Sequence, residues 1–134
     1  QHDFQEFIFS CSRPHDKMLE LLKRAKAVLG CKVAALSNEG KELGRYRIEK
    51  YHLKELCDYF IVSGFVGFVK PDERIYKLAI NISQSNPNQI VYVDDRPHLI
   101  EAGKRMGFHT ILHHNAEETC SALEALTGRK ILSL

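Results

Sequence analysis

The chain has 134 residues, of which 44% are hydrophobic and 27% are charged, and these proportions are typical of a single water-soluble globular domain. Lys and Arg together number 19 and Asp and Glu 17, which gives a formal net charge of +2, with the two signs mixed along the chain. This mixture argues against a nucleic-acid-binding face, and no apolar run approaches the length of a membrane span, so we expect a cytoplasmic protein.

The first half of the chain alternates between helical and strand patterns. We expect a helix over about residues 16–29, with an apolar stripe and a glycine as its stop, and then a buried strand over residues 31–36. A polar turn over residues 37–40 follows that strand. The next helix runs over about residues 42–52, and the helical spacing of its charges indicates a solvated face.

The alternation continues after this helix. A short strand lies within residues 56–63, and a glycine-punctuated apolar stretch over residues 64–69 leads to Lys70 and Pro71. Pro71 is well suited to the start of a helix, because proline is tolerated in the first turn. Residues 86–88, with the sequence Asn-Pro-Asn, end that helix.

Residues 89–112 predict strand, acidic turn, helix and strand in that order. The first of these strands ends in two adjacent acids, Asp94 and Asp95. Carboxylates at the carboxyl end of a strand lie where open parallel sheets bind their ligands. Their mutual repulsion is most easily relieved by a cation, and oxygen ligands of this kind suit magnesium. A last amphipathic helix is expected over residues 117–126.

Alternating helices and strands predict an α/β fold in which a parallel sheet is covered on both faces. Three polar clusters, around Ser37, Lys70 and Asp94, each follow an apolar strand-like segment. In a doubly wound sheet they would converge on one rim. The N-terminal apolar cluster over residues 4–9 fits either the last turns of a helix or a short strand, and periodicity alone does not choose between them.

These clusters resemble motifs two, three and four of the haloacid dehalogenase superfamily. The matching segments occur in the expected order over about residues 13–126, and they are LSNEG, YRIEKY, FVKPDERIYKLAI and VYVDDRP. The sequences of these segments are similar to those of the superfamily's phosphatase-like branch, whose members have a small helical cap. The resemblance implies a Rossmann-like core in three layers.

The resemblance also implies a role for each motif residue. Ser37 would donate a hydrogen bond to a phosphoryl oxygen, and Asn38 would orient the substrate. Lys70 would neutralise charge as the phosphoryl group is transferred. Asp95 would bind magnesium directly, with Asp94 acting through a water molecule or as an acceptor behind it. The implied reaction is magnesium-dependent transfer of a phosphoryl group from a small phosphorylated metabolite to an aspartate and then to water.

Family members also carry a first motif, an apolar strand ending in Asp-x-Asp, whose first aspartate attacks phosphorus and whose second is the general acid and base. This sequence contains no such motif. In the simpler interpretation, which we favour, residues 1–12 are the remnant of a helical cap, residues 13–134 are the core, and the central first strand is missing. In the other interpretation, residues 7–12 replace that strand, with Ser10 and Ser12 where the two aspartates would stand.

Either interpretation leaves no attacking carboxylate, so we expect this chain to be inactive. Leu99 also replaces the polar residue that the family usually has four residues after Asp95, which weakens the case for magnesium. The alternative function is a non-catalytic binding or assembly module on the same fold. A missing central strand would leave two unpaired edges in the middle of the sheet, and these would favour a homodimer.

Overall fold

The computed structural model of the protein describes residues 4–10 and 15–131. In this part of the chain the strands form one five-stranded sheet in the order β3-β2-β1-β4-β5. All four neighbouring pairs run parallel, as the alternating pattern predicts. The strands are β1 (Glu6–Ser10), β2 (Lys32–Ser37), β3 (Tyr59–Val62), β4 (Ile90–Asp94) and β5 (His109–Leu112).

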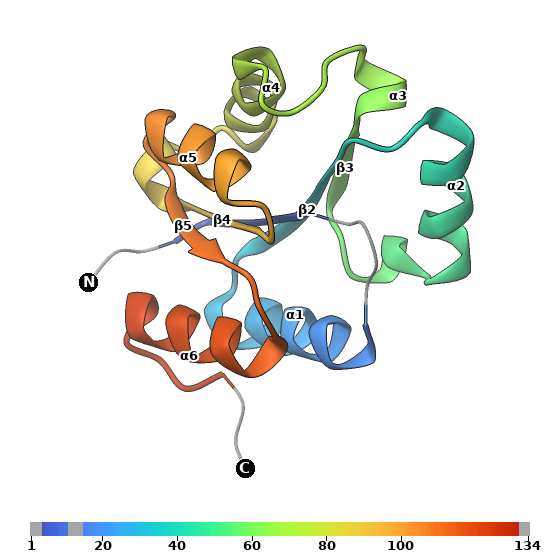
Figure 1. Ribbon diagram of the computed structural model, residues 1–134. Helices are drawn as coiled ribbons and strands as arrows, with labels where there is room; N and C mark the ends of the chain where they lie inside the picture. Colours follow the sequence, from blue (N-terminus) through green and yellow to red (C-terminus); the bar gives the residue numbers. More distant parts are fainter. Residues whose placement is uncertain (1–3, 11–14, 132–134) are drawn as a thin grey trace.

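Helices cover both faces of the sheet, so the predicted three-layer α/β fold is confirmed. Helices α1 and α6 lie on one face and α4 and α5 on the other, while α2 and α3 lie together near β3 (Figure 1). Within the described residues, no helix combines the length and the apolar character needed to cross a lipid bilayer. The helices are α1 (Asp16–Leu29), α2 (Lys41–Lys50), α3 (Ser63–Val66), α4 (Glu73–Ser83), α5 (Pro97–Arg105) and α6 (Ala116–Thr127), with short 3-10 turns η1 (Leu53–Glu55) and η2 (Pro87–Gln89).

The segment Glu6–Ser10 is the central strand of the sheet. It pairs with β2 on one side and with β4 on the other. The favoured interpretation, in which this segment is a cap remnant and the central strand is missing, is therefore wrong for residues 6–10. The alternative, in which the segment replaces the first strand, describes these residues correctly. Residues 11 and 12, with Ser12, lie outside the described residues.

The side chains of β1 explain its central position. Phe7 and Phe9 point to the face covered by α1 and α6, and their exposed fractions are 1% and 3%. Ile8 points to the opposite face, against α4 and α5, and is 0% exposed. A strand that is apolar on both faces is stable only where helices cover both faces, and in this fold that is the middle of the sheet.

The pairing of β1 also bears on the expected homodimer. That prediction rested on two unpaired strand edges in the middle of the sheet, and the structure pairs both of them. A second copy of the chain therefore finds no unpaired strand edge in the middle of the sheet. A homodimer stays a prediction without this support.

The glycine-punctuated stretch after β3 contains a helix that sequence patterns did not predict. This helix, α3, is a single turn that brings Gly64 against the start of α2. A Cβ atom at position 64 would collide with the backbone nitrogen of Lys41. Gly44, on α2, lies against Val62 in the same way, because a Cβ atom at position 44 would be 2.9 Å from a methyl carbon of that valine. Close backbone approach therefore fixes α2 against the end of β3.

A third close approach lies behind the carboxyl end of β4. The ring of Tyr92 is 0% exposed and makes edge-to-face contacts with Tyr76 and Phe108 at centroid distances of 5.6 and 6.1 Å. Gly103, on α5, leaves room for this ring, because a Cβ atom there would lie 2.6 Å from its Cδ2 atom. The enclosed aromatic ring has little freedom to move away.

We therefore expect Gly103→Ala to destabilise the domain by about 1–3 kcal/mol, which is the usual cost of overpacking a core. Gly40→Ala is the matched control, because a Cβ at position 40 would meet no atom within 4 Å and the φ angle there is −67°. The free energy of unfolding in urea, measured for both variants, checks this. Equal losses in the two variants would contradict the close approach of Gly103 and Tyr92.

Candidate functional site

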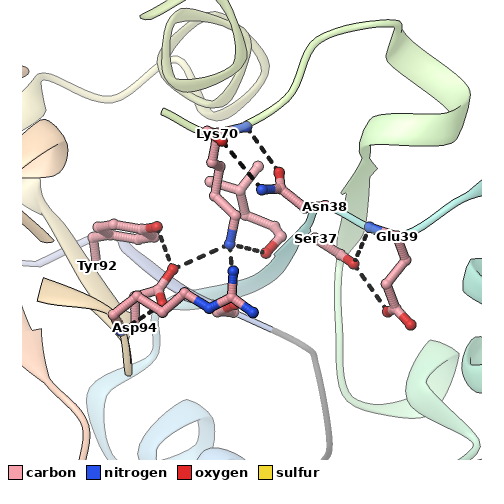
Figure 2. Close-up of polar contacts among 9 residues, drawn as sticks. Ser37, Asn38, Glu39, Lys70, Tyr92 and Asp94 are labelled. Atoms are coloured by element: carbon pink, nitrogen blue, oxygen red, sulfur yellow. Dashed lines mark hydrogen bonds and ion pairs between the residues drawn. The ribbon is translucent and has the colours of Figure 1, made fainter. Parts of the chain in front are cut away.

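Four side chains meet at one edge of the sheet, which we call the carboxyl rim because the parallel strands end there. Ser10 ends β1, Ser37 ends β2 and Asp94 ends β4. Lys70 comes from the loop before α4 and reaches between them. Figure 2 shows its ammonium group lying between the Tyr92–Asp94 pair and the segment that carries Ser37 and Asn38. The predicted convergence of the three polar clusters is confirmed.

The ammonium group of Lys70 is buried and fully hydrogen-bonded. The side chain is 2% exposed, and Nζ donates to Ser10 Oγ at 3.0 Å, to the Leu36 carbonyl oxygen at 3.1 Å and to Asp94 Oδ2 at 3.1 Å. Three acceptors match the three N–H groups of an ammonium, so Lys70 is charged in this arrangement. Burial lowers the pKa of Lys70 from its usual value, and the carboxylate of Asp94 opposes that shift.

The carboxylate of Asp94 is equally enclosed. Its Oδ2 atom accepts from Lys70 and, at 2.6 Å, from the hydroxyl of Tyr92, while Oδ1 accepts from the backbone N–H of Arg96 at 3.1 Å. Burial alone would raise the pKa of Asp94, but the ammonium and these hydrogen bonds favour the charged form and hold the pKa below its usual value. Tyr92 is a site residue that sequence reasoning missed, because in the sequence it is one more apolar position of a buried strand.

Asn38 supports the backbone of Lys70 rather than pointing away from it. Its side-chain oxygen accepts from the Lys70 N–H at 2.8 Å, and its amide nitrogen donates to the Lys70 carbonyl oxygen at 3.2 Å. This reciprocal pair joins the loop after β2 to the loop before α4 (Figure 2). The side-chain amide of Asn38 thus fixes the position from which Lys70 enters the rim.

Ser37 is paired with Glu39, two residues further along the chain. The Ser37 hydroxyl donates to Glu39 Oε1 at 2.9 Å and accepts the Glu39 backbone N–H at 3.0 Å. The other carboxylate oxygen, Oε2, lies 3.0 Å from Nε of Arg47, on α2. Sequence reasoning missed both Glu39 and Arg47: Glu39 lies in a polar turn, and Arg47 belongs to a helix whose charges indicated only a solvated face.

Asp95 lies apart from this enclosed cluster. It follows Asp94 in the turn before α5 and is exposed, whereas Leu99 is 2% exposed in the first turns of that helix. Leu99, which stands where the family usually has a polar residue, is therefore an apolar side chain turned away from solvent. Among the described residues, Asn38 and Asp94 are the predicted site residues that bond to Lys70, whereas Ser37 bonds to Glu39 and Asp95 joins neither group.

The donor set at the rim does not suit magnesium. Both oxygens of Asp94 already accept hydrogen bonds from protein groups, and Ser10 offers a neutral hydroxyl where a carboxylate would be needed. Asp95 beside them presents an exposed carboxylate. In the part of the chain that the structure describes, no three His, Cys, Asp or Glu side chains are grouped so that they could hold a metal ion. A hard cation that needs several oxygen ligands is not accommodated by these residues.

An open cavity of about 1000 Å³ lies beside the rim. Its lining combines apolar side chains with charged and polar ones, as small-molecule sites do. Burial lowers the pKa of His113, one of its histidines, whose Nδ1 lies 2.6 Å from the hydroxyl oxygen of Thr119. The polar and charged residues of the lining include Ser10, Glu39, Arg47, Asp94, Asp95 and His113.

Comparison with known proteins relates the chain to one family of hydrolases. A model of haloacid dehalogenase-like hydrolases matches residues 1–107. Among curated proteins, the chain is 34% identical over 76 residues to mouse bifunctional epoxide hydrolase 2, covering 57% of this chain and 14% of that protein. It is 32% identical over 82 residues to D-ribitol-5-phosphate phosphatase of Bacteroides thetaiotaomicron, covering 61% of this chain and 35% of that protein. The chain thus spans only a minor part of the curated relatives.

Solved structures share the fold. An uncharacterized protein from Corynebacterium glutamicum superposes with a TM-score of 0.81 at 21% identity, covering 93% of this chain and 96% of that one. A dehalogenase superposes with a TM-score of 0.66 at 27% identity, covering 72% of this chain and 42% of that one. The Corynebacterium structure shows that the whole arrangement of strands and helices occurs in a chain of similar length.

The burial of the Lys70–Asp94 pair predicts a large cost when one partner is removed. Lys70→Met leaves the carboxylate of Asp94 buried without its cation, so we expect a loss of about 3–5 kcal/mol in the free energy of unfolding at pH 7. Lys104→Met is the control, because its pair with Glu101 spans 3.3 Å between side chains that are 56% and 60% exposed, and such pairs contribute at most about 1 kcal/mol. Urea denaturation measures both, and losses of similar size would contradict the account.

We expect the contribution of the Tyr92 hydroxyl to the free energy of unfolding to depend on pH. Tyr92→Phe removes one donor to the Asp94 carboxylate, so we expect a loss of about 1.5–3 kcal/mol at pH 7. Because the folded-state pKa of Asp94 lies below its usual value of 3.8, this contribution is complete above that value and is lost as the pH falls through the folded-state pKa. The stability gap between wild type and variant should therefore narrow in that acidic range.

The matched control for this prediction is Tyr51→Phe, at the end of α2, where the ring is half-buried against the core on the other face of the sheet. Its effect on unfolding should not vary over the acidic range. A gap between wild type and Tyr92→Phe that stays constant as the pH falls would show that the hydroxyl does not act through the Asp94 carboxylate.

Proposed function

The chain belongs to the haloacid dehalogenase-like hydrolases, and on this premise we propose that its carboxyl rim binds a small phosphorylated metabolite without transferring the phosphoryl group. The proposal is supported by the position of Ser37 at the end of β2, of Asp94 at the end of β4 and of Lys70 in the loop before α4. The cavity beside them is large enough for a small metabolite.

The observation that carries the proposal is the contact between Ser10 and Lys70. Ser10 ends the central strand, where the family resemblance expects the attacking aspartate, and its Oγ lies 3.0 Å from Lys70 Nζ. A serine hydroxyl becomes a nucleophile when a neighbouring base removes its proton. Lys70 does not supply that base, because all three of its N–H groups are donated and its nitrogen has no free lone pair. Lys70 therefore does not activate the Ser10 hydroxyl.

The sheet topology supports the same conclusion. A phosphatase that works through an aspartyl-phosphate needs its aspartate at the end of the central strand. That position lies between β2 and β4 and is filled by β1. The rim also lacks a donor set that suits magnesium, the ion with which the implied phosphatase reaction would neutralise charge. Both points favour binding over hydrolysis, which is the non-catalytic alternative that the missing first motif suggested.

The rim retains groups that can bind a phosphoryl oxygen. The Ser10 hydroxyl accepts from Lys70 and has no acceptor for its own proton among the residues that the structure describes, so this proton can be donated to a ligand in the cavity that Ser10 lines. The ammonium of Lys70 donates to this hydroxyl at 3.0 Å and so orients the hydroxyl proton away from itself, while its charge is balanced by Asp94. A phosphoryl group at this place would meet a donor backed by a buried cation.

The test is to assay the purified chain with p-nitrophenyl phosphate and magnesium, and to titrate it with inorganic phosphate by calorimetry. We expect saturable binding of phosphate and no release of p-nitrophenolate above the buffer rate. Release that is abolished by Ser10→Ala would contradict the absence of transfer. Absence of phosphate binding, even when Glu39, which accepts the Ser37 proton, is replaced by alanine, would contradict the binding half of the proposal.

The substitution Ser10→Asp tests the same proposal in the opposite direction, because it places a carboxylate at the end of the central strand. A carboxylate at this position adds an oxygen anion beside Lys70, in the cavity that Asp95 also lines, so we expect measurable magnesium binding and a burst of p-nitrophenolate as the phosphoryl group passes to the new carboxylate. Ser10→Asn has a similar shape and no charge, and it should show neither effect. If the two variants behave alike, the missing carboxylate is not what prevents transfer.

A further inference from the structure

A carboxylate of the protein itself occupies the position in which Ser37 would meet a ligand. Only 12% of the Glu39 side chain is exposed, and it lines the cavity beside the rim. Its Oε1 atom receives the Ser37 hydroxyl proton at 2.9 Å. A hydroxyl has a single proton to donate, so Ser37 has none left for a phosphoryl oxygen while Glu39 is in place.

Arg47 holds the other end of this carboxylate. Its Nε atom lies 3.0 Å from Glu39 Oε2, and its side chain is 20% exposed at the cavity wall. Within the described residues, Oε2 is buried and accepts no well-directed hydrogen bond, so this contact is mainly an attraction between charges. A guanidinium carries five N–H groups, and those on its two terminal nitrogens remain for another anion.

We infer that Arg47 is a phosphoryl-binding residue of this site and that Glu39 takes the place of the phosphoryl group in the ligand-free domain. This inference rests on the proposed function and names two residues that govern it. An arriving phosphoryl group displaces the Glu39 carboxylate, receives the Ser37 proton and pairs with the guanidinium of Arg47. Arginine suits this exchange because its planar fork matches both carboxylate and phosphate oxygens.

The exchange also accounts for the charge of the site. Lys70 is already neutralised by Asp94, and the donor set at the rim does not suit magnesium. Arg47 then supplies a positive charge at the cavity wall, where the carboxylate of Glu39 now lies between its guanidinium and the Ser37 hydroxyl. Because Glu39 competes for that charge and for Ser37, it lowers the affinity of the site for compact anions.

The experiment is a calorimetric titration of the full chain with inorganic phosphate. Glu39→Gln removes the competing charge and keeps an acceptor for Ser37, and Glu39→Ala frees Ser37 as well. We expect both variants to bind phosphate about fivefold more tightly than wild type, or better, which corresponds to one charge interaction screened by water. Equal affinity in wild type and both variants would overturn the role of Glu39.

Arg47→Ala, made in wild type and in Glu39→Gln, tests the other residue. Loss of a charge-assisted contact should weaken phosphate binding about tenfold in both backgrounds, and Arg47→Lys should lie between. Arg45→Ala is the control, because Arg45 is exposed on the same helix and stacks over Phe65 at 5.6 Å. Circular dichroism and urea unfolding confirm that each variant is folded. Unchanged affinity in Arg47→Ala would overturn its role.

The two proposals fail differently in this experiment. If wild type binds phosphate and the changes at Glu39 and Arg47 have no effect, the inference falls and the proposed function stands. If neither wild type nor Glu39→Ala binds phosphate, the proposed function falls, and the inference falls with it.

Discussion

The ammonium of Lys70 is a full positive charge that water hardly reaches, and its burial costs several kcal/mol unless each N–H finds an acceptor. The three acceptors come from three neighbouring strands: Ser10 from β1, Leu36 from β2 and Asp94 from β4. One side chain therefore joins the carboxyl ends of the three central strands. Asn38 sets the place from which this side chain enters, by binding both backbone groups of Lys70.

The same interaction limits the chemistry of the rim. An ammonium that donates all its protons cannot act as a base, and a carboxylate that accepts from Lys70, Tyr92 and Arg96 has little capacity for a metal ion. Hydrogen bonds and ion pairs within the protein thus occupy the groups that would otherwise bind reactants. The groups that remain for a ligand are the Ser10 proton and, once Glu39 is displaced, Ser37 and Arg47.

Sequence patterns predicted much of this architecture, because they depend on local rules. Hydrophobic periodicity and turn residues placed Ser37, Lys70 and Asp94 at strand ends, and parallel strands bring such ends together. The central strand was harder to predict, because an apolar run of five or six residues has no period long enough to separate helix from strand. The contact between Glu39 and Arg47 was also missed, since it depends on how α2 leaves the turn after β2, and this angle is set by Gly44 and Gly64 rather than by either charged residue.

A motif residue can be present in this fold because folding requires it or because the function requires it. The second cause alone gives information about function. Lys70 and Asp94 stabilise each other in a place where neither could stay charged alone, so folding is a sufficient reason for both to be present. They would be needed in a binding domain as much as in an enzyme. Ser10 is different, because an aspartate in its place would also accept a hydrogen bond from Lys70, so the pairing of Lys70 does not by itself require a serine there. The residue at the end of the central strand is therefore the one whose identity distinguishes transfer of a phosphoryl group from binding alone.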